Sequence, residues 1–241
     1  MAWALPSIVT KTAKHCLSEP DSAARALSAW ALEQLRYGAE RYREFRKSYP
    51  FEIRVVRRTA YTNLARDSVP MVRQQRERER SERWGDPYQP GRVIERSARG
   101  FSVPILFIAA LADSAFWEHH CFAASGMEGT SGNRVVRLRF YRVPGTRDVD
   151  WEGAALIDSA TSILRRVEFR LAGLDPGDVP KAFEGYTVFA APSPYIVIPD
   201  TTIAMWWRRE RVPDADWGPP DVAQMIYVEA VRYRRQKPPS E

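Results

Sequence analysis

The residues with the greatest potential for chemistry form one run, residues 118–121 (EHHC), in which every side chain is a possible metal ligand. Neighbouring residues on a helix or strand point in different directions, so four consecutive side chains cannot converge on one ion. Zinc sites need wider ligand spacing and a partner from elsewhere in the chain. A metal-dependent enzyme using His119, His120 and a nearby carboxylate is therefore an alternative only. His15, beside Cys16, could supply the distant ligand if Cys16 and Cys121 come together.

The two cysteines, Cys16 and Cys121, are the candidate pair for a disulfide. They could equally be two buried thiols or contribute to the same metal site. A bond between them would close a loop of roughly 100 residues, for which the chain-entropy model gives about 4–5 kcal/mol of stabilisation. The residues alone leave these alternatives open.

Other catalytic signatures are missing from the sequence. There is no Gly-x-Ser-x-Gly elbow and no Ser-x-x-Lys motif, and the three histidines are too few and too clustered for a triad. Residues 126–132 (GMEGTSG) lie between strand-like segments, which predicts a β-turn rather than a phosphate-binding loop. We therefore expect no catalytic residue, no resident metal and no cofactor.

The net charge of +6 is carried mainly by arginine, and residues 71–83 (MVRQQRERERSER) are the most arginine-rich stretch. A nucleic-acid binder acting through segment 73–83 is a second alternative. Interleaved glutamates weaken its field, and it lacks aromatic side chains for base stacking, so no nucleic-acid partner is expected. The stretch predicts either an exposed strand pairing with residues 51–61 or a solvated helix.

Composition predicts a globular protein. The chain has 241 residues, of which 44% are hydrophobic and 12% aromatic. It contains no apolar run long enough for a transmembrane helix, and its apolar start, MAWALPSIV, lacks the basic residues and cleavage site of a complete signal peptide. We expect an N-terminal segment over 1–20, tied by Cys16 if the disulfide forms, a single α+β domain over 21–236, and a frayed tail over 237–241.

One long helix is predicted over residues 21–48. Asp21 or Ser22 after Pro20 can cap its start, and residues 48–50 (SYP) end it. An apolar stripe at helical spacing predicts that it covers a sheet; the stripe consists of Leu27, Ala31, Leu35, Tyr42 and Phe45.

The clearest strand pattern is a hairpin over residues 155–174 (ALIDSATSILRRVEFRLAGL). Val167, Phe169 and Leu171 alternate with charged residues, which is the period of a strand with one buried face. The turn formers from Asp158 to Ser162 predict the reversal between the strands.

The remaining segments predict one curved, mostly antiparallel sheet of seven to nine strands, half-barrel-like, covered by the long helix and by a short helix near 112–120. Residues 103–111 (VPILFIAAL) fit a buried strand, with a buried helix as the rival. The other predicted strands cover 51–57, 135–143, 151–157, 164–171, 186–190, 195–198, 202–208 and 225–233.

Aromatic residues on the later strands are candidates for a binding surface. Trp206 and Trp207 are adjacent, so a strand would place one on each face of the sheet. Both could be ordinary packing, or one could line a groove with Phe189 and Tyr195, because tryptophan is enriched at interfaces.

Several motifs in order resemble the C-terminal region of bacterial envelope proteins labelled "carboxypeptidase regulatory-like domain-containing protein". The first part of the pattern matches in the LADSAFWEHHCF stretch through Leu111, Asp113, Phe116, His120, Cys121 and Phe122. The second part matches through Gly153, Ile157, Asp158, Thr161, Leu164, Arg165, Glu168, Phe169 and Arg170. The hairpin is also similar to those of periplasmic lipoprotein carriers, which fold as open half-barrels.

This resemblance implies an extracytoplasmic setting, in the periplasm or at the outer membrane, which favours the disulfide. It carries over no catalytic residue and no peptidase activity. The signal peptide and transthyretin-like β-sandwich usual in these proteins are not visible here. The expected function is a non-enzymatic envelope module that binds a partner protein or an apolar ligand on its curved sheet.

Overall fold

The structure is a computed structural model that describes residues 22–62, 71–81, 88–97, 100–103, 106, 108–111, 113–130, 133–175, 177, 180–193, 196–208 and 220–234. Its helices are α2 (Ser22–Ser48), α3 (Ile108–Leu111) and α4 (Ser114–His119). Its strands are β1 (Phe51–Tyr61), β2 (Met71–Arg80), β3 (Glu95–Ser97), β4 (Gly100–Ser102), β5 (His120–Glu128), β6 (Val135–Arg142), β7 (Asp150–Asp158), β8 (Leu164–Ala172), β9 (Ala182–Ser193), β10 (Ile196–Trp207) and β11 (Val222–Tyr233).

Nine strands form one antiparallel sheet in the order β2-β1-β11-β10-β9-β8-β7-β6-β5, and β3 pairs with β4 in a separate hairpin. Strands β5 to β11 follow one another as a meander, and the early strand β1 closes against the last strand, from Phe51 opposite Tyr233 to Tyr61 opposite Val222. The predicted fold class, an α+β protein built on one antiparallel sheet, is confirmed.

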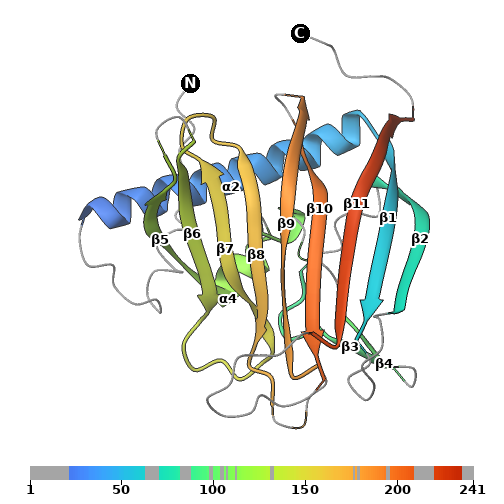
Figure 1. Cartoon of the computed structure of the whole chain (residues 1–241). Helices are drawn as coiled ribbons and strands as arrows, with labels where there is room; N and C mark the ends of the chain where they lie inside the picture. Colours follow the sequence, from blue (N-terminus) through green and yellow to red (C-terminus); the bar gives the residue numbers. More distant parts are fainter. Residues whose placement is uncertain are drawn as a thin grey trace.

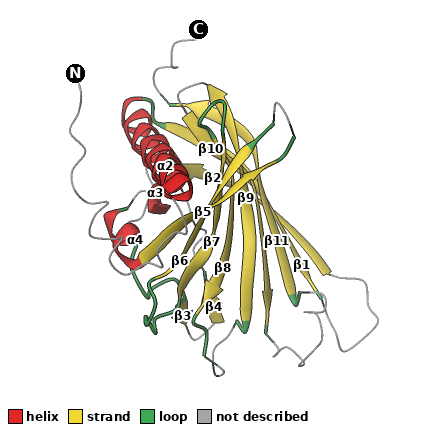
Figure 2. Cartoon of the chain, turned by 90° about the vertical axis from the view of Figure 1, so that its left-hand side faces the viewer, coloured by secondary structure: helices red, strands yellow, loops and turns green. Residues whose placement is uncertain are grey.

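Helix α2 crosses one face of the sheet, here called the inner face (Figure 1), and contacts β5, β6, β7 and β10. Helices α2, α3 and α4 lie on this side, as the view from the edge shows (Figure 2). The predicted stripe is buried at Ala31, Leu35, Tyr42 and Phe45, while Leu27 is partly buried against the core. No helix among the described residues is long and apolar enough to cross a membrane.

Large and small residues alternate across the inner face at the centre of the sheet. Phe140 lies opposite Gly153, Gly153 opposite Phe169, and Phe169 opposite Gly185. A Cβ atom would lie 1.9 Å from a backbone oxygen of the neighbouring strand at Gly153, and 2.1 Å at Gly185. Both positions therefore require glycine, because the backbones approach each other too closely for a side chain.

The predicted hairpin is confirmed as β7 and β8, and Asp158 builds its turn. One carboxylate oxygen accepts from the amides of Ala160 (3.0 Å) and Thr161 (2.8 Å), and the other accepts from Arg165 (2.9 Å). Hydrogen bonds to the charged form hold the pKa of Asp158 at about 2, the backbone amide of Thr161 contributing most. Ser162 completes the turn in the left-handed region, with φ 59°.

The structure decides between the alternatives at two early segments, and it confirms the short helix that follows them. Residues 71–80 form the exposed strand rather than the solvated helix. Within 103–111 the rival interpretation holds over Ile108–Leu111, which form a helix against α2, while residues 104, 105 and 107 lie outside the described part. The short helix is capped by Asp113 and ends at His119, because the chain then enters β5, a strand that was not predicted.

Candidate binding site on the outer face

The predicted aromatic site residues lie mostly within the packed interior. Phe189 and Trp207 are buried, with 5% and 8% of their surface exposed. Trp206 is half-buried and faces inward, its ring stacked 6.0 Å from Phe183 between ring centres. Tyr195 lies outside the described residues. A role of these four side chains in contacting a ligand stays a prediction.

The two neighbouring histidines contact backbone carbonyls instead of converging on one point. His119 Nδ1 lies 2.8 Å from the carbonyl oxygen of Ala115. His120 Nδ1 and Nε2 each lie 2.8 Å from a carbonyl oxygen, of Phe116 and Trp151 respectively. Within the described part of the chain no group of three or more His, Cys, Asp or Glu side chains could hold a metal ion.

His120 belongs instead to a buried polar cluster with Asp150 and Tyr88. The Tyr88 hydroxyl donates to Asp150, whose other oxygen accepts from the Trp151 amide (2.8 Å) and lies 3.8 Å from His120 Nε2. Burial lowers the pKa of His120, with Asp150 acting in the opposite direction. Burial and the hydrogen bond to Asp150 raise the pKa of Tyr88.

This cluster joins the segment around Tyr88, which lies between β2 and β3, to the starts of β5 and β7. The Phe116 ring stacks on the His120 ring, with 3.8 Å between the ring centres. His120 is 0% and Asp150 2% exposed, so neither can meet a solvent-borne substrate in this structure. The cluster is therefore a structural joint between segments. His120 is a candidate from its sequence neighbours, but no local pattern pairs it with Tyr88 and Asp150, because both are distant in the chain.

Cys121 follows His120 on β5 and is completely buried. Its predicted partner Cys16 lies outside the described residues. The disulfide between them stays a prediction.

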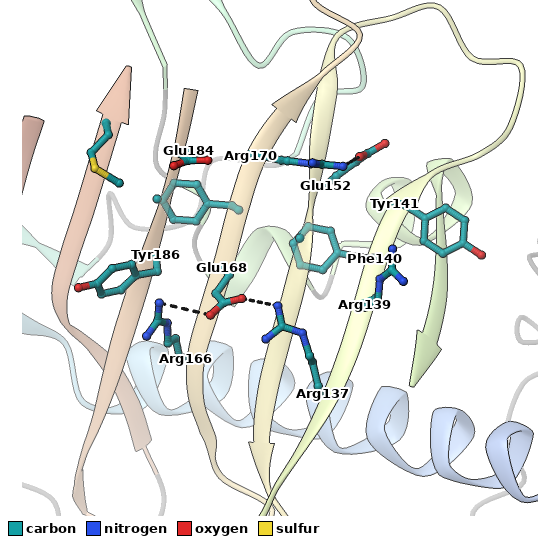
Figure 3. Close-up of a pocket in the computed structure, with 14 residues that line it drawn as sticks. Arg137, Arg139, Phe140, Tyr141, Glu152, Arg166, Glu168, Arg170, Glu184 and Tyr186 are labelled. Atoms are coloured by element: carbon teal, nitrogen blue, oxygen red, sulfur yellow. Dashed lines mark hydrogen bonds and ion pairs between the residues drawn. The ribbon is translucent and has the colours of Figure 1, made fainter. Parts of the chain in front are cut away.

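A pocket of about 540 Å³ opens on the opposite side of the sheet, the outer face (Figure 3). In the close-up, α2 lies behind the strands, and the labelled arginine, glutamate and tyrosine side chains lie on the side of the sheet away from it, whereas Phe140 belongs to the inner-face core. The pocket spans β6 to β10. Its lining includes four arginines, three glutamates, two tyrosines and a methionine: Arg137, Arg139, Arg166, Arg170, Glu152, Glu168, Glu184, Tyr141, Tyr186 and Met205.

Glu168 is the central charge of the pocket. One of its oxygens accepts from Arg137, and the other lies 3.3 Å from a nitrogen of Arg166. The guanidinium of Arg166 also lies over the Tyr186 ring, 3.8 Å from the ring centre. A carboxylate and an aromatic face therefore contact the planar Arg166 group from two sides.

A second carboxylate in the lining, Glu152, also forms ion pairs. Its oxygens lie 3.0 Å from a nitrogen of Arg170 and 3.6 Å from a nitrogen of Arg142. Arg139 is exposed and makes no ion pair with any described residue. With four arginines against three glutamates in the lining, the pocket has an excess of positive charge.

The pocket was not predicted, although its signal is present in the alternating pattern. Arg166, Glu168 and Arg170 occupy the wet face predicted for the second hairpin strand, and Arg137 and Arg139 alternate in the same way on β6. The alternating pattern does not reveal which strands are neighbours. It therefore could not show that Arg137 on β6 lies next to Glu168 on β8, across the intervening strand β7.

No protein-family model and no curated protein matches the sequence, so the likeness to carboxypeptidase regulatory-like domain proteins finds no support in these comparisons. Among solved structures, similar chains include a LolA superfamily protein of Nitrosomonas europaea, with 12% identity and a TM-score of 0.42 over 86% of this chain and 94% of that chain. A putative outer membrane lipoprotein-sorting protein domain of Vibrio parahaemolyticus has 12% identity and a TM-score of 0.37 over 85% and 95% of the two chains.

A DUF1329 family protein of Desulfovibrio piger is similar at 11% identity, with a TM-score of 0.41 over 86% of this chain and 95% of that chain. At this level of similarity these structures establish neither a family nor a ligand for this chain.

Proposed function

We propose that this protein is a non-enzymatic binding module that receives a partner protein in the outer-face pocket. The observation that carries this proposal is the preformed, half-buried arrangement of Glu168, Arg137, Arg166 and Tyr186. We further propose an extracytoplasmic location, supported by the motif resemblance described above.

The chemistry of the lining favours a protein partner over an apolar ligand. Arginine, tyrosine and methionine are enriched where proteins meet, because each combines a large contact area with adaptable or directional bonding. An apolar ligand would have to remove these charged groups from water without compensation. On the inner face, the described core side chains lie buried between α2 and the sheet.

The excess of arginine indicates which partner groups fit. Arg139 is exposed and lacks an ion pair among the described residues, while Arg166 contacts Glu168 and the Tyr186 ring. A guanidinium presents two parallel N–H groups to a carboxylate, so an acidic side chain of the partner is the matching group. The Tyr186 and Tyr141 rings would then contact the apolar neighbours of that acidic residue.

Site-specific photocrosslinking in cells tests the proposal. A photoreactive residue replaces Met205, which lines the pocket, or, as a control, Tyr37 on the solvent side of α2, where 56% of the tyrosine surface is exposed. We expect one discrete protein adduct from position 205 and none from position 37. Combining the position 205 probe with Arg166→Ala and Tyr186→Ala should remove the adduct.

The free energy of unfolding of each variant, measured in urea, shows whether a lost adduct reflects lost folding. Binding of the purified, crosslink-identified partner should weaken as ionic strength rises, because exposed charges are screened. Equal adducts from positions 205 and 37, or an adduct that survives the double substitution in a folded protein, would overturn the proposal.

A further inference from the structure

The two edges of the nine-stranded sheet are built differently. At the β5 edge, α2 packs against the strand, and the amide of Ala124 donates to the Ser28 hydroxyl of the helix (2.7 Å). A register shift between Ala124 and Met127 further interrupts this edge. These features protect β5 from pairing with another strand.

The opposite edge, β2, has no such protection among the described residues. It is ten residues long, contains neither proline nor glycine, and eight of its residues are exposed. Met71 and Val72 at its start are 67% and 63% exposed. A long regular edge strand is a template for a further strand.

Charged side chains normally protect such an edge, but only if they repel an incoming strand in every register. On β2 the charges are sorted by face. Even-numbered residues are on the outer face, where Arg76 lies 3.6 Å from Glu229. Odd-numbered residues are on the inner face, where Glu77 lies 3.4 Å from Arg57.

A two-fold axis perpendicular to the sheet keeps the faces of both copies the same, so even residues meet even residues and odd residues meet odd residues. With the axis at Gln75, Arg73 of each copy lies opposite Glu77 of the other, and no like charges are directly opposed. An axis at Arg76 would place that arginine opposite itself. Cross-strand pairs of opposite charge stabilise a sheet and like charges destabilise it, so the pattern selects the Gln75 register.

We propose that two copies of this chain associate antiparallel through β2, with Gln75 on the two-fold axis, to form one continuous sheet. In this register Met71 and Val72 lie against the aliphatic stems of Glu79 and Arg78 of the other copy, which covers the exposed apolar side chains. Glu229 neutralises Arg76 where the arginines of the two copies come nearest. The association is independent of the outer-face pocket.

Strand pairing of this length buries less surface than the roughly 1,200–2,000 Å² of stable interfaces, so the dimer should be weak and depend on concentration. Sedimentation velocity from about 1 to 100 µM should show a monomer converting to a dimer. Arg73→Glu should raise the dissociation constant about tenfold, because two attractive pairs become repulsive.

A cysteine cross-link tests the register itself. Gln75→Cys brings two Cα atoms to about 4.5–5.5 Å across the axis, within disulfide range. Val72→Cys is the matched control, because its two copies lie about 20 Å apart along the strands. A covalent dimer on a non-reducing gel is expected from the first variant and not from the second.

Three results would overturn the inference. The first is a parent protein that sediments as a monomer throughout the concentration range. The second is a Val72→Cys protein that cross-links as fast as the Gln75→Cys protein. The third is pairing of β2 with a different protein's strand while this chain itself stays monomeric.

Discussion

Two regions of the molecule bring charged and polar groups together but differ in their exposure to solvent. One is the buried cluster of His120, Asp150 and Tyr88, and the other is the outer-face network around Glu168. In the first, the His120 and Asp150 side chains are almost fully buried, and their partners are mainly backbone groups. In the second, the carboxylate and its two arginines are about 30–40% exposed. A polar group buried without its partner is costly, whereas an exposed ion pair contributes little to stability. The first region should therefore control folding, and the second is free to serve binding.

The largest effect is expected beside the buried cluster, at the predicted disulfide. Cys16→Ser should lower the free energy of unfolding by about 4 kcal/mol, because it opens the long cross-linked loop. Urea denaturation measures this change. A reductant should lower the stability of the parent by the same amount and leave the variant unchanged; a parent insensitive to reductant would show that the bond is absent.

Asp150→Ala should cost about 3 kcal/mol, because it leaves the Tyr88 hydroxyl and the Trp151 amide buried without their acceptor. Glu184→Ala, an exposed carboxylate in the pocket, is the matched control and should change stability by less than about 0.5 kcal/mol. Similar costs for the two variants would remove the distinction between the regions.

Gly153→Ala should cost about 2–3 kcal/mol, because its Cβ would collide with the backbone oxygen of Glu168. Gly38→Ala is the contrasting variant, since a Cβ there meets nothing within 4 Å and alanine favours the helix. It should be neutral or stabilise the protein by up to about 1 kcal/mol. If Gly153→Ala is tolerated equally well, the strands approach less closely than described.

Acid should weaken the β7–β8 turn through Asp158. Its pKa in the folded protein is about 2, below the ordinary value of 3.8, so the carboxylate stabilises the fold above about pH 4. This contribution is lost as the pH falls from about 4 towards 2. Asp158→Asn should flatten the dependence of stability on pH in that window. An unchanged slope would show that other carboxylates account for it.

The smallest effect on stability is expected from Arg166→Ala, at about 0–1 kcal/mol, because the Arg166 ion pair and its ring contact are partly exposed. The same variant should nevertheless weaken binding of the crosslinked partner, measured by titration of the purified proteins. Arg165→Ala is the neighbouring control; Arg165 contacts Asp158 rather than the pocket. A large loss of stability in Arg166→Ala would mean that the pocket also supports the fold.

Local patterns predicted most of the secondary structure. The stripe over 21–48, the alternation over 164–171 and the turn formers after Asp158 each depend on neighbours in sequence, and each is confirmed. Strand β5 was missed because its sequence, HCFAASGME, has no clear alternation and directly follows a helix. The hydrogen bond from Ala124 to Ser28 and the pairing with β6 stabilise it as a strand.

The sequence by itself determined that this chain is an α+β protein, with one amphipathic helix, a set of strands and turns of defined chemistry, because side-chain period and turn propensity are local properties. Only the tertiary structure decided which strands are neighbours, and hence that Glu168 lies between Arg137 and Arg166, that His120 lies near Asp150, and that β2 is left at an open edge. These contacts join residues from different strands and connecting segments. Local propensity does not encode which distant segments come together.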